Sequence, residues 1–527
     1  MAEEQTPLLD RPPAVGSGND LNGCGPLQRA PNGQHVSWKS AYMLMMSRMV
    51  GAGVFATPGV VAQTAGSPGL ALLVWIMGAG ITACQASIIL EYGCMLPRSG
   101  GEKVYLEFVY RRPRWLMSTI FAVRAVMMMT TANNSIIFGE YLMHGLSPNP
   151  SNRSRKISTL ALLLISATLH GLFLRLGLRV QNALGWCKIA MLLFMILTAV
   201  GTVILHSSPF EDTQRRSAPI VHKGIWDGSS WGLETVTLAL FKVQYAYAGV
   251  ENANNVLDEV RDPVQMLKRI MPLAIISACL LYVLLNVAFF LVLPLNEIKD
   301  SGEMAAAVFF DRLFGADAGG ILISLLIAIS VAGNVMVGVF SVCQSRLNQE
   351  IARQGFLPSR FASSQPHNAP LGGVLVNLVP SALLILFLPS QNVYSFILSA
   401  EGYTRQWIDI ALAAGLLWLR QNHPDLPRPF RAWQPLIWLR LCLCVAMALA
   451  PFIPERAPMA PGTGTFHGMY AVVGLAIIGA ATLYWFTWAK VLPYFGQHCL
   501  TEQEGIHPDG TSYREIVRVR CHDRSRY

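Results

Sequence analysis

The sequence predicts an all-α polytopic membrane protein with twelve transmembrane helices, ten of which form two inverted five-helix repeats. Of its 527 residues, 53% are hydrophobic and only 13% are charged, about half the charged fraction of an average soluble protein. A dozen apolar runs are long enough to cross a bilayer. The first and the sixth of these runs lose helical character midway, and each begins a five-helix unit.

The expected spans follow one another along a single transmembrane domain, residues 39–490. We place them at about 40–62, 69–92, 116–142, 157–174, 184–206, 230–250, 269–293, 319–343, 371–389, 392–418, 435–453 and 468–489. The repeats then cover about 39–206 and 230–418, and two further helices follow within 435–489. Runs of this length and apolarity exclude a transmembrane β-barrel.

Two polar segments flank this domain. Residues 1–38 are rich in Pro and Gly and lack the basic-then-apolar layout of a signal peptide, so we expect an uncleaved, disordered tail. Residues 491–527 form a second tail that is rich in arginine. Lys and Arg are commoner in the connections on the side of these tails, which predicts that both termini are cytosolic. The net charge of +9 therefore reflects topology and does not indicate nucleic-acid binding.

No enzyme chemistry is expected. The ten cysteines include no CxxC pair, so neither a disulfide framework nor a zinc site is supported. A membrane-embedded enzyme would need a catalytic set such as Ser/His, paired Asp or HExxH, and the sequence has none. We therefore predict no catalytic residue, no metal ligand and no cofactor.

The two interrupted spans carry the chemistry. The first reads MMSRMVGAGVFATPG, with Gly51-Ala52-Gly53 at its centre, although each Gly costs a helix interior about 1 kcal/mol relative to Ala. The sixth reads LALFKVQYAYAGVENANNVLDEV and weakens over 245–249, after which the polar residues 251–255 follow.

A broken helix exposes backbone N–H groups where it restarts and carbonyls where it stops. The N–H groups and the positive end of the helix dipole attract a carboxylate, whereas the carbonyls attract an ammonium group. Two such breaks side by side suit a zwitterion such as an amino acid. A single GxG within a span is more often a packing feature, but two breaks at matching repeat positions favour binding.

Several short motifs occur along the chain in the order and spacing found in a known protein family. They are Gly51-Ala52-Gly53-Val54-Phe55 with Pro58-Gly59, Glu91-Tyr92-Gly93, Pro97-Arg98-Ser99-Gly100-Gly101, Tyr105-Leu106, the break at Tyr245 to Gly249, Ser345-Arg346 and the run Ala352 to Pro358. From about residue 38 to 490 the chain resembles the amino acid–polyamine–organocation superfamily, in its L-type amino acid transporter branch. Within that branch, residues 101–103 and 251–256 look most like fungal high-affinity methionine permeases.

This resemblance implies a LeuT-type fold with a central site between the first and sixth spans. The implied substrate-binding residues all lie at the two breaks: Gly51, Ala52, Gly53, Tyr245, Ala246, Tyr247 and Gly249. N–H groups of 51–53 would bind the substrate carboxylate, and carbonyls of 245–247 its ammonium group. Tyr245 also takes the place of the family's aromatic gate. The family often has Ser at position 52 and Trp at position 250, where this chain has Ala and Val. The resemblance therefore predicts the head group of the substrate better than its side chain.

One charged residue within a span, Lys188, bears on whether transport is coupled to an ion. Lys188 occupies the position at which sodium-independent members have a lysine that stands in for the sodium ion, so sodium coupling is not expected. A lysine that snorkels to the interface is the alternative interpretation. Glu140, Glu234, Glu251 and Glu401 are candidates for a coupling proton site, and the sequence leaves proton symport and exchange both open.

The remaining expectations concern partners and location. The partners are a small-molecule amino acid and the lipid bilayer, without nucleic acid. The loop GLSPNPSNRSRK has no cysteine, so no disulfide-linked heavy chain is expected, and it carries a glycosylation sequon at Asn152. Residues 4–9 form an acidic dileucine pattern typical of vacuolar sorting. The plasma membrane is the first expectation for location, and the vacuolar membrane is the alternative.

The sequence therefore predicts a secondary-active permease that moves a neutral amino acid by alternating access, with methionine as the first candidate. An exchanger of broader neutral specificity and an amino acid sensor with little flux would need the same pocket. Both alternatives stay open at this stage.

Overall fold

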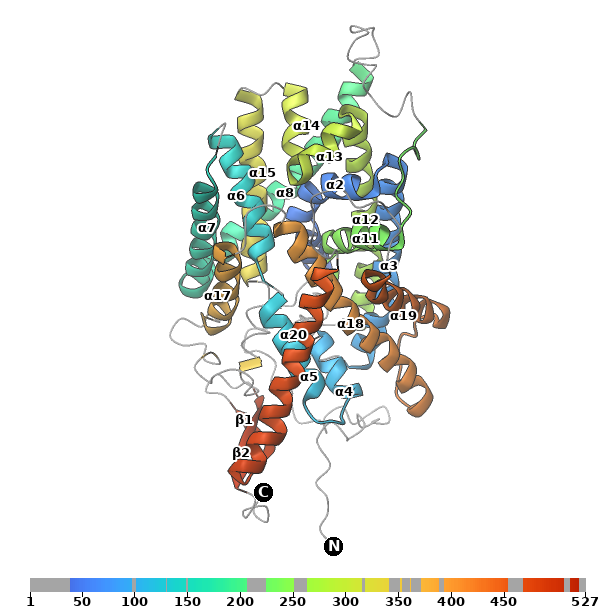
Figure 1. Ribbon diagram of the computed structural model, residues 1–527, viewed down its shortest axis with the longest axis vertical. Coiled ribbons are helices and arrows are strands. Elements are labelled where there is room, and N and C mark those ends of the chain that lie inside the picture. The colour runs from blue at the N-terminus through green and yellow to red at the C-terminus, as the bar shows by residue number, and fades with distance from the viewer. Residues whose placement is uncertain are drawn as a thin grey trace.

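The computed structural model is a bundle of helices with one small β-hairpin (Figure 1). It describes residues 38–96, 101–128, 130–147, 150–205, 224–250, 263–314, 318–340, 351–352, 361, 371–387, 393–453, 468–506 and 512–520. The predicted N-terminal tail, the dileucine pattern at 4–9 and the polar residues 251–255 lie outside these ranges.

The first half of the chain forms eight helices among the described residues. They are α1 (Trp38–Met49), α2 (Ala52–Ala65), α3 (Pro68–Met95), α4 (Gly101–Val109), α5 (Leu116–Met128), α6 (Ala132–Leu146), α7 (Asn152–Leu172) and α8 (Leu174–Leu205). Local sequence explains the start of α3: the Ser67 hydroxyl accepts a hydrogen bond from the Leu70 N–H at 3.2 Å, and Pro68 occupies the first helical position.

The second half is also helical and is followed by a C-terminal extension. Its elements are α11 (Leu233–Ala246), α12 (Pro263–Val292), α13 (Leu295–Ser301), the 3₁₀ turn η4 (Gly302–Met304), α14 (Ala305–Phe314), α15 (Ala318–Phe340), α17 (Leu371–Phe387) and α18 (Val393–Asn422). The extension contains α19 (Gln434–Leu449), η6 (Ala450–Phe452), α20 (Met469–Phe486), η7 (Thr487–Val491), α21 (Leu492–Gly496), β1 (His498–Ile506) and β2 (Ser512–Arg520).

Within the described residues, six helical segments are long and apolar enough to cross a membrane. They are Pro68–Met95, Leu116–Leu146, Ala183–Gly201, Val264–Val292, Gln434–Phe452 and Met469–Gly496. Two shorter apolar segments, Ser324–Val339 and Leu371–Phe387, accompany them. Large apolar side chains such as Leu197, Ile276 and Leu483 are exposed on these helices, as expected of surfaces that face lipid. The chain is thus a polytopic helical membrane protein.

Helices at matching positions in the two halves pack against each other. α2 contacts α11, α3 contacts α12, α6 contacts α15, and α7 contacts α17. Since these helices hold the same places in the order of the two predicted repeats, the first helix of one half lies beside the first helix of the other. This arrangement brings the two interrupted segments together in the interior.

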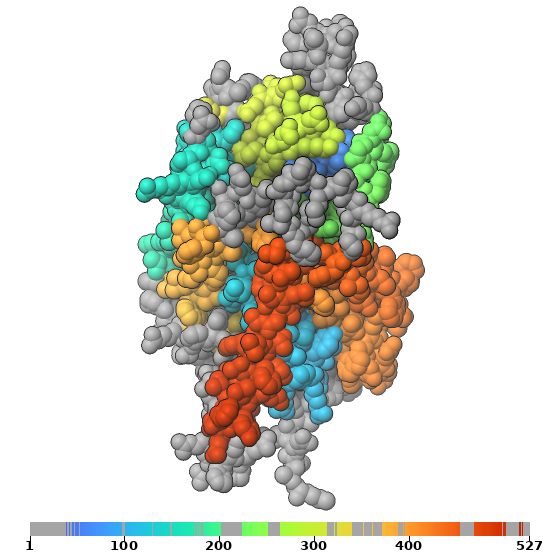
Figure 2. All heavy atoms as spheres, viewed as in Figure 1, coloured from blue at the N-terminus to red at the C-terminus, as the bar shows by residue number. Residues whose placement is uncertain are grey.

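The C-terminal segment ends in a structure that the sequence analysis did not anticipate. β1 and β2 pair antiparallel with His498 opposite Arg520 and Ile506 opposite Ser512. Leu500 and Ile516 of this hairpin pack against the main hydrophobic core. Figure 2 shows α20 and the hairpin as one ridge on the visible face, while Figure 1 places α13 and α14 at the opposite end of the molecule.

Buried ion pairs hold α18 in the bundle. Asp409 of α18 accepts hydrogen bonds from Gln85 Nε2 of α3 at 2.9 Å and Arg405 Nε at 3.0 Å, and Arg440 Nη2 of α19 lies 2.5 Å from its other oxygen. Arg405 also pairs with Glu102 of α4. Asp409 and Arg440 are almost fully buried, so each charge depends on the other for stabilisation.

Replacing Asp409 should therefore destabilise the fold. We expect Asp409→Ala to lower the free energy of unfolding by about 3–5 kcal/mol, because it leaves buried guanidinium groups without their carboxylate. Thermal unfolding in detergent measures the effect.

Arg312→Ala is the matched control, since its 3.7 Å pair with Glu297 is exposed and such pairs contribute little. Equal effects of the two substitutions would show that the Asp409 cluster does not stabilise the fold.

Candidate functional site

The first interruption separates α1 from α2. The backbone of Gly51 is extended, with φ −127° and ψ −159°, and it caps the start of α2. The N–H of Val50 bonds back to the Met46 carbonyl at 2.8 Å, and the N–H of Val54 bonds to the Gly51 carbonyl at 3.3 Å. The N–H groups at the very start of α2 lie outside the hydrogen bonds of that helix, as at any helix N-terminus.

Glycine is favoured at this break because neighbouring helices approach the backbone. A Cβ atom on Gly51 would overlap the side-chain amide of Asn334 in α15. A Cβ atom on Gly53 would lie 3.2 Å from Ala246 Cα in α11. The predicted carboxylate-binding segment is therefore wedged between α11 and α15.

The second interruption ends α11. Ala246 is the last residue of the helix, and the N–H of Ala248 bonds to the Tyr245 carbonyl at 3.2 Å. Gly249 has φ +126°, a conformation that side chains disfavour, and a Cβ atom there would lie 2.6 Å from Arg48 Cγ. The structure thus places the end of α11 directly against the end of α1.

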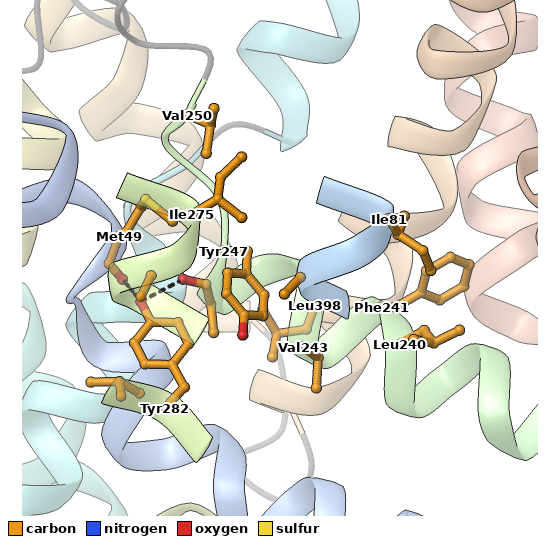
Figure 3. Close-up of a cluster of buried hydrophobic side chains, with 14 of the residues drawn as sticks. Met49, Ile81, Leu240, Phe241, Val243, Tyr247, Val250, Ile275, Tyr282 and Leu398 are labelled. Atoms are coloured by element: carbon orange, nitrogen blue, oxygen red, sulfur yellow. Dashed lines mark hydrogen bonds between the residues drawn. The ribbon is translucent and has the colours of Figure 1, made fainter. Parts of the chain in front are cut away.

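One tyrosine joins the two interruptions. Tyr282 of α12 places its hydroxyl 2.7 Å from the Met49 carbonyl and 3.0 Å from the Ala246 carbonyl (Figure 3). The single phenolic proton is shared between two helix-end carbonyls, and the ring packs edge-on against Trp75 with a centroid separation of 5.4 Å. The sequence analysis missed Tyr282, since a tyrosine in an apolar run carries no local signal.

Tyr245 and Tyr247 point to different surroundings. The Tyr245 hydroxyl donates to Asn134 Oδ1 of α6 at 2.8 Å, and its ring meets Tyr394 of α18 edge-on at 6.4 Å. The Tyr247 hydroxyl instead donates to the Trp75 carbonyl of α3 at 3.3 Å, so its side chain is occupied in the core. Tyr245 of α11 therefore contacts both α6 and α18 beside the break.

Further polar groups lie near the breaks, and of these the sequence analysis named only Glu401, as a candidate proton site. Asn133 Nδ2 lies 3.5 Å from Glu401 Oε2, which links α6 to α18. Asn334 is buried, and its Oδ1 atom has no hydrogen-bond partner within the described part of the chain. The spacing of residues in the sequence could not place these side chains near the breaks, because Asn133, Glu401 and Asn334 lie on three different helices.

Lys188 and Asn152 have contrasting environments. Lys188 is fully buried in α8, which packs against α15 and α12, so its ammonium group is enclosed by protein. Asn152 is exposed as the first residue of α7, directly after Ser151, whose hydroxyl accepts from the Ser154 N–H at 3.1 Å. Among the described residues, no group of three His, Cys, Asp or Glu side chains could hold a metal ion.

Comparison with known proteins covers nearly the whole chain. The model of the amino acid permease family matches residues 36–479. The chain is 29% identical over 495 residues to the low-affinity methionine permease of Saccharomyces cerevisiae, which covers 93% of this chain and 89% of that protein. It is 28% identical over 482 residues to the yeast high-affinity methionine permease, covering 90% and 83%. With the human Asc-type amino acid transporter 1 it shares 26% over 445 residues, covering 84% and 81%. These relatives are permeases and transporters, as the absence of a catalytic motif led us to expect.

The bridge made by Tyr282 can be tested directly. We expect Tyr282→Phe to lower the free energy of unfolding by about 1–3 kcal/mol, because two buried carbonyls lose their shared donor. Chemical or thermal unfolding in detergent measures the loss. Tyr494→Phe is the control, since Tyr494 is 81% exposed. An unchanged stability of Tyr282→Phe would show that the hydroxyl does not hold the two breaks together.

Proposed function

Because this chain belongs to the amino acid permease family, we propose that it is a secondary-active permease that carries a neutral amino acid across a membrane by alternating access. We further propose methionine as its substrate, since two of its relatives are methionine permeases. The observation that carries the proposal is the meeting of two helix breaks, with Gly53 of α2 against Ala246 of α11.

The proposed architecture is a LeuT-type fold of twelve spans with a 5+5 inverted repeat. The packing of α2, α3, α6 and α7 against their counterparts α11, α12, α15 and α17 supports it. Inverted repeats place the substrate at their interface near mid-membrane, where discontinuous helices supply backbone groups. In this architecture the two breaks fall at equivalent positions.

The proposed binding mode uses opposite ends of two half-helices. The N–H groups at 51–53 bind the substrate carboxylate, helped by the positive end of the α2 dipole. The carbonyls at 245–247 bind the ammonium group. The Ala246 carbonyl keeps a second lone pair for this purpose, because the Tyr282 hydroxyl uses only one.

Tyr245 is the proposed gate over this site. Its hydroxyl bond to Asn134 contributes about 1 kcal/mol, which is small enough for repeated opening and closing. We also propose that the ammonium group of Lys188 replaces a sodium ion between α8 and the first break, so that transport is independent of sodium. Both roles are assigned by position; Lys188 is fully buried, and Tyr245 is partly buried.

We further propose that the protein works without a disulfide-linked heavy chain and resides in the plasma membrane, with its termini in the cytosol. The loop at 145–156 has no cysteine that could form such a link. The vacuolar membrane is the alternative location, because of the dileucine pattern at 4–9.

Uptake of radiolabelled methionine by the purified protein in liposomes tests the proposed function. The assay is run with and without a proton gradient and with an excess of each unlabelled amino acid. Uptake that follows the gradient and is blocked mainly by methionine supports a proton-coupled methionine permease. Uptake that requires trapped internal amino acid identifies an exchanger, and binding without flux identifies a sensor; either result overturns the proposal.

The glycine at the first break gives the sharpest substitution test. We expect Gly53→Val to reduce methionine uptake at least about tenfold while the protein stays inserted, because the added side chain separates α2 from Ala246. Gly80→Ala is the control, since a Cβ atom there meets nothing within 4 Å. Normal uptake by Gly53→Val would remove the site from the first break.

The role of Lys188 predicts a second result. We expect Lys188→Ala to lower transport strongly, since the buried cation that links α8 to its neighbours is lost. Uptake is measured with and without sodium. If sodium restores uptake by Lys188→Ala, the ammonium group replaces the ion in the wild type. Full activity of Lys188→Ala without sodium would contradict the proposed role.

A further inference from the structure

The hairpin of α13, η4 and α14 covers the end of the molecule that lies opposite the C-terminal strands (Figure 1). It rests on α2, where a Cβ atom on Gly59 would overlap the Gly302 carbonyl. Lys299 Nζ donates to the Gly66 carbonyl at 2.7 Å, and the Tyr141 hydroxyl donates to the Glu303 carbonyl at 2.8 Å. The hairpin is therefore seated on the half of the first broken helix that follows the break.

Glu303 lies at the centre of this contact. Its carboxylate is close enough to Glu140 of α6 and Lys242 of α11 for both charges to act on it. Glu140 is held by Arg155 Nη1 at 3.2 Å, and Lys242 Nζ donates to Thr64 Oγ1 of α2 at 2.7 Å. The Glu303 carbonyl thus joins the hairpin to α6, and charges on α6 and on the second broken helix act on its carboxylate.

The other ionisable groups around η4 are accounted for. α2 contributes none, and Tyr141 and Tyr394 contribute neutral phenols. The remaining charged groups of the hairpin are engaged elsewhere or exposed: Glu297 pairs with Arg312, Asp311 interacts with His144, Lys299 binds the Gly66 carbonyl, and Asp300 is exposed. Among the described residues, Glu140 and Lys242 therefore dominate the field at Glu303.

Burial and the negative charge of Glu140 raise the pKa of Glu303 from 4.5 to about 7, and Lys242 offsets only part of this effect. If the hairpin lifts and Glu303 enters water, its pKa returns to its ordinary value. The seated hairpin therefore binds a proton more tightly than the lifted hairpin does. By linkage, lowering the pH towards 5 favours the seated state, and this preference is lost as the pH rises through 7.

We propose that Glu303 is a proton-binding site and that it takes up a proton from the adjacent solution when the hairpin closes over the substrate. The proton comes from water on the hairpin side and attaches to a carboxylate oxygen of Glu303. Ionised Glu303 destabilises the closed state because the negative charge of Glu140 acts on it in a half-buried position. The inference rests on the proposed permease function, in which this hairpin covers the outer side.

The test measures the initial rate of methionine uptake while only the pH on the hairpin side varies from about 5.5 to about 8. For a closed-state pKa of about 7 and an open-state value of 4.5, linkage changes the closure equilibrium about thirtyfold over this range. We expect wild-type uptake to fall as the pH rises towards 7 and to level off above it, with a midpoint below pH 7. Glu303→Gln should lose this dependence and keep a high rate at pH 8, and Glu303→Asp should retain it.

Glu297→Gln is the matched control, because Glu297 lies in the same hairpin and its ion pair is exposed. Glu140→Gln should shift the midpoint to lower pH, since it removes the like charge. A wild-type pH profile in Glu303→Gln, or an unshifted midpoint in Glu140→Gln, would overturn the inference while leaving the permease function intact.

A measurement without flux separates the two proposals. The thermal midpoint of Glu303→Gln in detergent should exceed that of the wild type increasingly as the pH rises through 7, because only the wild type loses a bound proton. This result stands even if no amino acid is transported. A pH-independent difference between the two proteins would overturn the proton site.

Discussion

The structure depends on one constraint: backbone polar groups within a membrane must find partners inside the protein. Two helices of this chain stop in the interior, so several carbonyls and N–H groups lose their helical partners. Tyr282 supplies a donor for the carbonyls of Met49 and Ala246, and the ends of α2 and α11 close over each other. The groups that remain at the start of α2 are those that a substrate carboxylate would satisfy.

Close packing makes this arrangement possible and also limits it. The glycines at the first break let α11 and α15 approach the backbone, so a methyl group at either position would force neighbours apart. Around this centre, the paired helices of the two halves and the buried Asp409 cluster form a fixed frame. The hairpin of α13, η4 and α14 is attached to this frame mainly by contacts to α2.

The features that could be predicted from the sequence are those that depend on neighbouring residues in the chain. The first break could be read from Gly51-Ala52-Gly53, because helix propensity and the length of a span are properties of consecutive residues. Tyr282, Asn134 and Asn334 could not be assigned to the site, since each reaches it from a helix distant in sequence. Glu303 was missed for a related reason: LNEIKDSGEM reads as a solvated loop, and only its packing on α2 shows that the carboxylate is enclosed. The pairing of β1 with β2 likewise depends on an interstrand register that polar, arginine-rich sequence does not reveal.

The charges in the interior divide into two kinds by the sign of their neighbours. Asp409 lies between two arginines, so its charge is compensated in place and its environment resists change. Glu303 faces a carboxylate as well as a lysine, and its compensation is incomplete until a proton binds. A charge of the first kind fixes helices to one another, whereas a charge of the second kind makes the stability of a contact depend on the solution. Here the second kind lies where the hairpin of α13, η4 and α14 meets the broken helices.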